Sequence, residues 1–367
     1  MKKHSITGLA GVAVLLLTGC ADMAGDVGSN GPDPEALGSP EVQEQMDQLY
    51  QQAQESNETS VVTYGPTEES YVPAYEVFME RYPEIQVQSE YIFGAELAAR
   101  LDQEFASGNR VGSIQNGGPA LTQLTYGGDR CQAYEPFTIS DEDIGADQVS
   151  EDNEYRALSI FPFGIAYNTD KVTEAEAPQS FTELTDPKWK GQLLVTDPHR
   201  VNGFTNSLAA MIDSGEFDMA WVEGIAQNDP MIASTSALSA QSIARGERGI
   251  DVMGQYNQYQ PLIEDGLPID FVFPTEDAVR AEYHYSCLLK DNPTPAATEL
   301  LYNWLYSEEG QNALAEAGVY GVRPGSTPPE GLPPLEEFGD EMLGNVPVPE
   351  AASAVQEVIT QNRTIFD

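Results

Sequence analysis

Arg200 and the residues after it have the types and spacing of an anion-binding site. Arg200 follows the end of a predicted strand. Asn202, Gly203 and Thr205 lie at the beginning of the helix predicted to follow. A guanidinium group and the free N–H groups of a helix N-terminus can together bind a phosphate, phosphonate or carboxylate. The alternative is an ordinary surface ion pair of Arg200, and the sequence leaves both interpretations open.

A run of hydroxyl side chains offers a second set of donors. Ser234, Thr235 and Ser236 precede a helix predicted to begin at Ala237. We expect Thr235 and Ser236 to contact the same ligand through hydroxyl and backbone groups. The alternative is that the segment is only the N-cap of that helix.

Three tyrosines lie at the end of a predicted strand or just after one, namely Tyr64, Tyr256 and Tyr259. Their rings can stack on an organic ligand, and they can equally pack a hinge between lobes. We expect at least one of them to contact the ligand.

Glycines mark several predicted strand-to-helix junctions. Gly65 and Gly203 lie at two of them, and Asn116 and Gly117 begin a third. Loops at the carboxyl ends of parallel strands collect in a crevice where helix N–H groups face a ligand. A plain turn is the alternative for each glycine.

The elements that must position these residues alternate between strand and helix. A helix is predicted over 41–56, and strands are predicted over 60–64, 85–92, 111–114, 160–168, 192–195, 249–254, 271–273 and 283–289. Further helices are predicted over 95–107, 203–213, 218–226, 237–246, 294–307, 309–317 and 350–361, with two more ending at Tyr82 and Tyr126. This alternation is typical of an α/β fold with parallel strands.

The N-terminus has the features of a secretory signal. Lys2 and Lys3 precede an apolar run over 6–17, which is too short to span a bilayer. Gly19 and Cys20 then complete a segment that resembles a bacterial lipobox, in which the cysteine is acylated. We expect Cys20 to anchor the mature chain to the outer face of the cell membrane through lipid.

The charge of the chain excludes one class of partner. The chain has 367 residues and a formal net charge of -42, from 59 acidic and 17 basic residues. Such a surface repels phosphate backbones, so nucleic-acid binding is not expected. Acids spread over the whole chain are typical of proteins adapted to salt, and a field that attracts cations is the alternative.

Two cysteines remain besides Cys20. Cys131 and Cys287 are expected to form a disulfide outside the cell, with two buried thiols as the alternative.

Several segments, in this order, resemble those of the family-1 extracellular solute-binding proteins of ABC importers, within their ferric-binding branch. They are SVVTYGPTEESYVPAYEVFMERYPEIQVQ, FGAELAARLDQE, FPFGIAYNTDKV, SFTELTDPKWKGQLLVTDP, AQSIARGERGIDVM and LLYNWLYSEEGQNALAEAGVYGVRPGS. The resemblance implies a type 2 periplasmic-binding fold, in which crossing strands join two α/β lobes around a ligand cleft. The expected divisions are a signal at 1–19, a tether at 20–40, lobe 1 at 41–160, lobe 2 at 161–275, and a return to lobe 1 with C-terminal helices at 276–367.

The resemblance also raises an iron alternative. Ferric-binding relatives hold Fe(III) with two adjacent tyrosines, a histidine and an acid. Here Tyr256 stands at the first tyrosine position, its neighbour is Asn257, and the next aromatic is Tyr259. Thr67 stands at the histidine position with Glu68 beside it. The alternative iron ligands are therefore Tyr256, Tyr259 and Glu68, and the full constellation is absent.

An enzyme is the less favoured alternative, together with a structural lipoprotein. The sequence lacks a Gly-x-Ser-x-Gly, a His-Glu-x-x-His and a phosphate-loop motif. His284 and Cys287 are three apart on a predicted strand, which puts them on opposite faces. The residues and the resemblance together predict a monomeric lipoprotein that captures a small solute and delivers it to an ABC permease. The expected solute is an organic or phosphorylated anion, with ferric ion as the alternative. No resident cofactor is expected.

Overall fold

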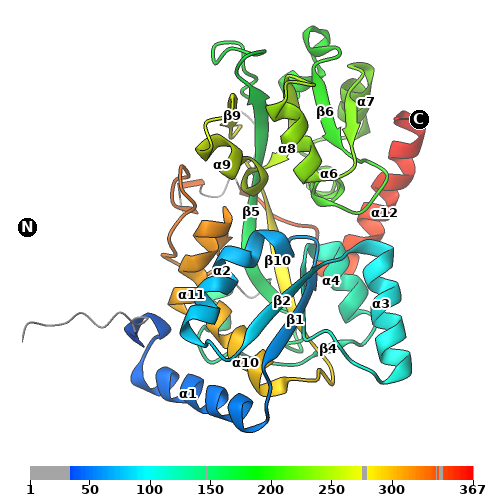
Figure 1. Ribbon diagram of the computed structural model, residues 1–367. Coiled ribbons are helices and arrows are strands. Elements are labelled where there is room, and N and C mark those ends of the chain that lie inside the picture. The colour runs from blue at the N-terminus through cyan, green and yellow to red at the C-terminus, as the bar shows by residue number, and fades with distance from the viewer. Residues whose placement is uncertain (1–33, 146–147, 275–278, 336, 339–341, 367) are drawn as a thin grey trace, which may run out of the picture. The chain divides into compact units, whose positions relative to one another are not determined.

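The strands form one mixed sheet in the computed structural model, which describes residues 34–145, 148–274, 279–335, 337–338 and 342–366. The strands are β1 (Ser60–Gly65), β2 (Gln86–Tyr91), β3 (Ile114–Gly117), β4 (Cys131–Gln132), β5 (Arg156–Asn168), β6 (Leu193–Thr196), β7 (Met231–Ala233), β8 (Ile250–Gln255), β9 (Ile269–Val272), β10 (Val279–Leu289), β11 (Tyr320–Gly321) and β12 (Met342–Leu343). Their main order is β2-β1-β3-β10-β5-β8-β6-β7. Figure 1 labels β1, β2, β5, β6 and β10 of this path.

Helices connect the strands and cover the sheet. The α-helices are α1 (Pro40–Glu55), α2 (Glu68–Arg81), α3 (Gly94–Ser107), α4 (Pro119–Tyr126), α5 (Asp141–Ile144), α6 (Gly203–Asp213), α7 (Met219–Gln227), α8 (Ser236–Ala244), α9 (Tyr256–Glu264), α10 (Pro295–Leu305), α11 (Glu308–Ala313) and α12 (Val348–Ile365). The 3-10 helices are η1 (Pro34–Leu37), η3 (Thr182–Thr185), η4 (Pro187–Trp189) and η5 (Leu314–Ala317).

Parallel pairs form the two ends of the sheet. β1 pairs in parallel with β2 and β3, and β6 pairs in parallel with β7 and β8. Parallel neighbours need long crossover connections, which the helices supply. We call β1, β2 and β3 with α2, α3, α4, α10 and α11 lobe 1, and β6, β7 and β8 with α6, α7, α8 and α9 lobe 2.

Two long strands connect the lobes, β5 and β10. They pair antiparallel from Arg280 beside Phe163 to Ser286 beside Arg156. β5 is buried along its whole length, which fits its nearly continuous apolar sequence. In Figure 1 both strands run through the middle, between the two sets of helices. The α/β class with crossing strands is therefore confirmed.

The C-terminal helix α12 contacts both lobes. It packs against α4 of lobe 1 and against α6 and α7 of lobe 2. On one side the Gln123 side-chain amide donates to Pro349 O at 2.6 Å, and on the other Asn362 Nδ2 donates to Pro198 O at 2.9 Å. The sequence placed this segment with lobe 1, so its contact with lobe 2 is an addition.

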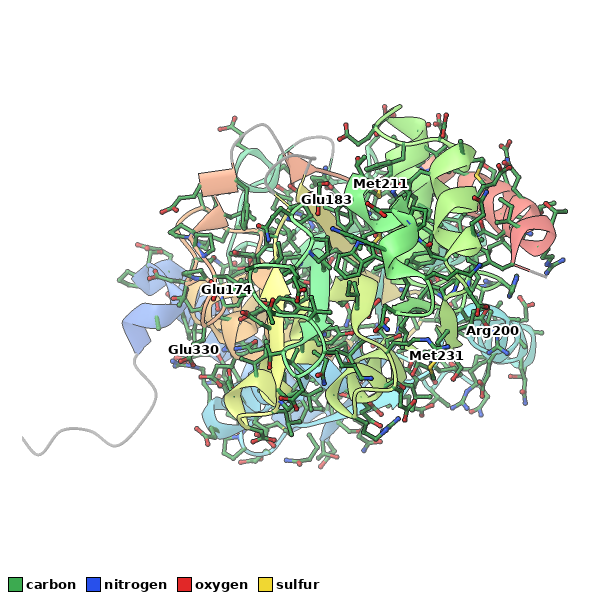
Figure 2. All side chains as sticks on the ribbon, turned by 90° about the horizontal axis from the view of Figure 1, so that it is seen from above. Glu174, Glu183, Arg200, Met211, Met231 and Glu330 are labelled. Carbon is green, nitrogen blue, oxygen red and sulfur yellow. A yellow bond between two sulfur atoms is a disulfide. The ribbon has the colours of Figure 1, made fainter. Side chains whose placement is uncertain are left out.

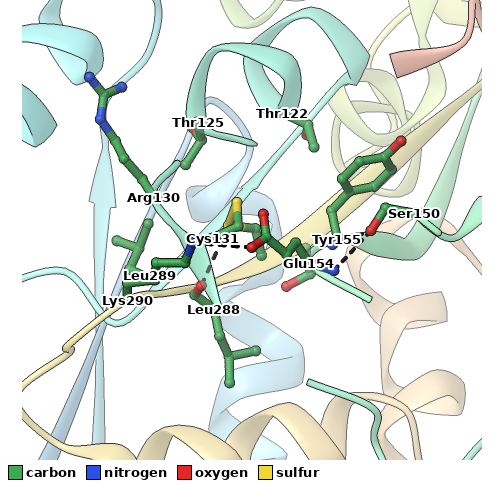
Figure 3. The surroundings of a disulfide bond; sticks show 12 residues. Thr122, Thr125, Arg130, Cys131, Ser150, Glu154, Tyr155, Leu288, Leu289 and Lys290 are labelled. Carbon is green, nitrogen blue, oxygen red and sulfur yellow. Dashed lines mark hydrogen bonds and ion pairs between the residues drawn. A yellow bond between two sulfur atoms is a disulfide. The ribbon is translucent and has the colours of Figure 1, made fainter. Parts of the chain in front are cut away.

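A disulfide joins Cys131 of β4 to Cys287 of β10, as the sequence led us to expect (Figure 3). Both cysteines are fully buried. Next to them the Lys290 ammonium lies 3.1 Å from a Glu154 carboxylate oxygen, and the Lys290 N–H donates to Arg130 O at 2.9 Å. The bond therefore secures a two-residue strand at the edge of lobe 1.

The structure corrects two local predictions. The third strand of lobe 1 is β3 at Ile114–Gly117 and not 111–114, because Gly112 packs against the Tyr64 ring before the pairing starts. The segment from Tyr256 forms the helix α9, where the sequence analysis predicted no element. Apolar side chains at helical spacing were too few there to reveal it.

The predicted signal at 1–19 and Cys20 lie outside the described residues, as does most of the predicted tether at 20–40. Among the described residues, no helix combines the length and the apolar composition needed to cross a bilayer.

Candidate ligand-binding site

A cavity lies between the lobes, with walls from both and a floor from the crossing strand β10. Its volume is about 980 Å³, including the part that opens to solvent. Pro66 and Thr67 belong to the lobe 1 wall, Arg200 and Thr235 to the lobe 2 wall, and Glu282 to the floor. Cavities at the interface of two lobes commonly bind small ligands.

The N-cap residues of six helices line this cavity. They are Thr67 of α2, Phe93 of α3, Gly118 of α4, Asn202 of α6, Thr235 of α8 and Gln255 of α9. The first N–H groups of a helix have no partner inside the helix, and the helix dipole adds partial positive charge there. The cavity therefore has a local preference for negative charge.

The helices around the cavity differ in how the N–H groups at their N-termini are satisfied. In lobe 2 the Asn202 side chain accepts from Thr205 N at 3.1 Å, and the Thr235 hydroxyl accepts from Leu238 N at 3.2 Å. The N-caps of α2, α3, α4 and α9 make no side-chain cap bond. Those four helix ends leave more of their N–H capacity for a ligand.

Arg200 lines the cavity from its rim. Its side chain is 66% exposed, and its Nε lies 3.1 Å from Asp197 Oδ2. In the view of Figure 2 it lies at the periphery of the molecule. The structure is thus compatible with both interpretations of the sequence, because Arg200 lines the cavity and also forms a surface ion pair.

The other predicted lobe 2 contacts divide into lining and supporting residues. Asn202, Gly203, Thr235 and Ser236 line the cavity. Thr205 does not, because its buried hydroxyl donates to the Arg200 carbonyl at 2.8 Å. Thr205 therefore shapes the loop that carries Arg200.

The floor contains polar residues that the sequence analysis did not select as ligand contacts. Asn206 Nδ2 donates to Glu282 Oε1 at 2.7 Å, and His284 Nε2 lies 3.6 Å from the same oxygen. The Thr67 hydroxyl lies 3.3 Å from His284 Nδ1. The signal in the sequence was an acid and a histidine two residues apart on a buried strand. Residues at that spacing point to the same face of the strand.

The rim also carries exposed apolar side chains that were missed. Tyr91 is 45% exposed and packs edge-on against Phe93, with ring centroids 5.3 Å apart. Leu124 is 42% exposed. All three line the cavity from lobe 1, so a ligand with an apolar face or a stacked ring can also be held there.

Tyr64 is a correction, because its ring does not line the cavity. It is fully buried inside lobe 1 and donates to Glu104 Oε1 at 2.8 Å. Burial raises the pKa of the Tyr64 hydroxyl, and the Glu104 hydrogen bond adds to this. Tyr64 therefore supports the α3 side of lobe 1.

Glu68 and Asn116 also lie beneath the cavity and not in its wall. Both are fully buried. Asn116 Nδ2 donates to Glu68 Oε1 at 2.9 Å, the Tyr75 hydroxyl donates to Glu68 Oε2 at 3.1 Å, and the Thr63 hydroxyl also donates to that oxygen. Burial raises the pKa of the Glu68 carboxyl, while these donors oppose the shift. Both residues are close in sequence to residues that line the cavity, which explains why they were wrongly predicted to contact the ligand.

Gly65 and Gly117 are glycines for packing reasons. A Cβ on Gly65 would lie 2.3 Å from the Asn116 carbonyl oxygen, and one on Gly117 would lie 2.8 Å from the Leu121 side chain. Neither residue lines the cavity in the described part of the chain. The plain structural alternative is therefore the better one for both.

Tyr256 and Tyr259 point to separate partners and do not converge with Glu68. The Tyr256 hydroxyl donates to Glu330 O at 2.9 Å, and the Tyr259 hydroxyl donates to Asp251 Oδ2 at 2.5 Å. Burial raises the pKa of Asp251 to about 6, although the Tyr259 hydrogen bond opposes this. Within the described ranges, no group of three histidines, cysteines or acids is placed to hold a metal ion.

Comparison with known sequences points to one family. A model of the bacterial extracellular solute-binding proteins matches residues 133–337, more than half of the chain. The Iron uptake protein A1 of Synechocystis sp. is 26% identical over 168 residues, which cover 41% of this chain and 45% of that protein. An uncharacterized protein of Haemophilus influenzae matches equally well over 44% of this chain and 47% of its own length. The chain spans about half the length of these curated relatives.

Comparison with solved structures shows the two-lobe fold of periplasmic binding proteins. Iron-bound HitA from Pseudomonas aeruginosa has a TM-score of 0.69 and 17% identity, covering 84% of this chain and 99% of that one. The substrate-binding protein of an ABC transporter from Agrobacterium tumefaciens has a TM-score of 0.74 and 15% identity, covering 84% and 94%. AfuA from Actinobacillus pleuropneumoniae, with fructose-6-phosphate bound, has a TM-score of 0.63 and 18% identity, covering 84% and 96%.

Proposed function

The chain belongs to the bacterial extracellular solute-binding protein family, and from that membership we propose that it captures a small organic anion for an ABC importer. The anion carries a phosphate, phosphonate or carboxylate group. The chain acts as a monomer, closes its lobes around the solute, and presents the closed form to the permease subunits.

One observation carries the choice of an anion, namely the six helix N-termini that open on the interlobe cavity. Each adds partial positive charge to the cavity, and the four ends without a side-chain cap bond also leave N–H donors for a ligand. The acids that line the cavity are Glu69 and Glu282. The anionic group therefore binds away from them, near Arg200 and the hydroxyls of Thr235 and Ser236.

Several structural neighbours are ferric ion-binding proteins by name, including one from Pasteurella haemolytica, and HitA is iron-bound. We prefer the organic anion because the tyrosines and the acid expected to hold iron are bonded to other groups. Tyr256, Tyr259 and Glu68 would all have to leave those partners and move into the cavity.

Isothermal titration of the purified protein tests this proposal. Fructose 6-phosphate and ethyl phosphate represent organic phosphates, and ferric citrate represents iron. We expect saturable binding of an organic phosphate with one site per chain. Binding of ferric ion alone would reverse the preference.

Arg200→Ala is expected to weaken binding of an organic phosphate about tenfold, because a charge-assisted hydrogen bond is lost at an exposed position. The matched control is Arg245→Ala, which removes a similarly exposed arginine of lobe 2 from its Glu247 partner. The control is expected to keep the wild-type dissociation constant. An unchanged constant for Arg200→Ala would show that the anion binds elsewhere.

We also propose that acylation of Cys20 holds the protein at the outer face of the cell membrane. Detergent phase partition of the protein from its host measures this directly. The wild-type protein is expected in the detergent phase and Cys20→Ala in the aqueous phase, because one sulfur is the attachment point. Equal partition of both proteins would refute the anchor.

A further inference from the structure

Two buried acceptor oxygens at the floor of the cavity lack donors. Glu282 is fully buried and Asn206 is 7% exposed. Glu282 Oε2 and Asn206 Oδ1 have no hydrogen-bond partner in the described part of the chain. Unsatisfied buried acceptors are costly, so each needs an explanation.

The orientation of the Asn206 amide is fixed by Glu282. Asn206 Nδ2 donates to Glu282 Oε1 at 2.7 Å. Rotating the amide by 180° would bring two acceptors together at that distance, which is unfavourable. The free oxygen of Asn206 is thus a consequence of the carboxylate beside it.

The protein itself offers little room for another donor. A Cβ on Gly118 would lie 2.2 Å from Glu282 Oε1 and 2.8 Å from Asn206 Nδ2, so the backbone of α4 closes one side of the pair. His284 Nε2 is 3.6 Å from Oε1, beyond a good hydrogen bond. Both Glu282 and Asn206 are among the residues that line the cavity.

A buried arginine lies on the same face of β10 as Glu282, because residues two apart on a strand share a face. Arg280 is fully buried two residues earlier on β10. Burial lowers the pKa of Arg280 to about 10, and the negative charge of Glu282 opposes that shift. A ligand therefore needs to bring a hydrogen-bond donor to this floor, and a second positive charge is unnecessary.

We propose that Glu282 and Asn206 accept hydroxyl groups of the solute, so that the solute is a hydroxylated organic phosphate. This inference rests on the proposed function, which supplies the anionic group near Arg200 and Thr235. Glu282 is then a specificity-determining residue that separates polyol phosphates from simple phosphates. A solute without hydroxyls would leave both acceptors buried and unpaired, which is the strongest form of rejection.

Titration of the purified wild-type protein with three kinds of probe tests the inference. Fructose 6-phosphate and glycerol 3-phosphate carry hydroxyls, ethyl phosphate carries none, and 2-aminoethylphosphonate carries an ammonium group. We expect the better hydroxylated phosphate to bind about 100-fold tighter than ethyl phosphate, from two charge-assisted or neutral hydrogen bonds.

Glu282→Gln keeps the shape of the side chain and removes its charge. We expect it to weaken binding of the hydroxylated phosphate about tenfold relative to binding of ethyl phosphate. The control is Glu264→Gln on α9, which lies outside the interlobe cavity and is expected to change neither constant.

The outcomes separate this inference from the proposed function. Equal affinities for hydroxylated and ethyl phosphate would overturn the inference and leave the anion site standing. Tighter binding of 2-aminoethylphosphonate would also overturn it, in favour of a cationic donor. Failure of every phosphate to bind would reject the proposed function and this inference with it.

Discussion

Loss of the Cys131–Cys287 disulfide is expected to lower the free energy of unfolding by about 4 kcal/mol. The bond closes a loop with a sequence separation of 156 residues. A crosslink over that distance removes a large part of the freedom of the unfolded chain. The disulfide also stabilises the native state, because β4 pairs with β10 over only two residues on one edge. Guanidinium chloride unfolding of wild type and Cys131→Ala/Cys287→Ala measures the difference.

A reductant provides the control for the disulfide. In reductant, the free energy of unfolding of wild type is expected to approach that of the double variant. The free energy of unfolding of the double variant is expected to be the same with and without reductant. A loss below about 1 kcal/mol would contradict the account and show that packing around β4 carries this edge of lobe 1.

Gly118→Ala is expected to weaken solute binding about 100-fold. Its φ of -65° suits alanine, so any effect comes from the new methyl group. That group would meet Glu282 Oε1 at 2.2 Å and Asn206 Nδ2 at 2.8 Å, and would push the pair into the cavity. Two hydrogen bonds to the solute would be misaligned, each worth about 1–2 kcal/mol. Titration with the tightest organic phosphate measures the loss.

Gly344→Ala is the matched control for this prediction. A Cβ there would meet only one atom of Tyr283, at 4.0 Å, which is an ordinary contact. The control is expected to keep wild-type affinity and stability. Full binding by Gly118→Ala would mean that the floor is not used by the solute.

The negative charge of the whole protein and an anionic solute are compatible. The chain carries a formal net charge of -42, which opposes the approach of an anion. At physiological ionic strength, exposed charges more than about 8 Å apart are largely screened. The helix N-termini act inside that distance, so the local field of the cavity decides binding.

The sequence predicted the elements of this fold better than its site. Alternating strands and helices, and the crossing strand at 160–168, follow from local patterns of apolar residues, and the structure has β5 at Arg156–Asn168. α9 was missed because Tyr256 begins a helix whose buried face includes polar side chains such as Asn257. A local sequence pattern indicates which face of an element is buried. It does not indicate which other element packs against that face.

The site was only half predictable because its residues meet through tertiary contacts. Arg200, Asn202 and Thr235 could be selected because each stands near a helix start that the sequence reveals, and all three line the cavity. Glu282 and Asn206 were missed since they are 76 positions apart and pair only when β10 and α6 come together. Tyr64 was wrongly assigned because a ring near a strand end can turn into the lobe as easily as into the cleft.

Native mass spectrometry of the protein purified from its host tests the central claim most directly. The interlobe cavity is expected to retain one small molecule per chain. Releasing that molecule and determining its mass and fragments is expected to identify a phosphate-bearing organic anion with hydroxyl groups. Recovery of ferric ion, or of an organic cation, as the retained solute would contradict the account.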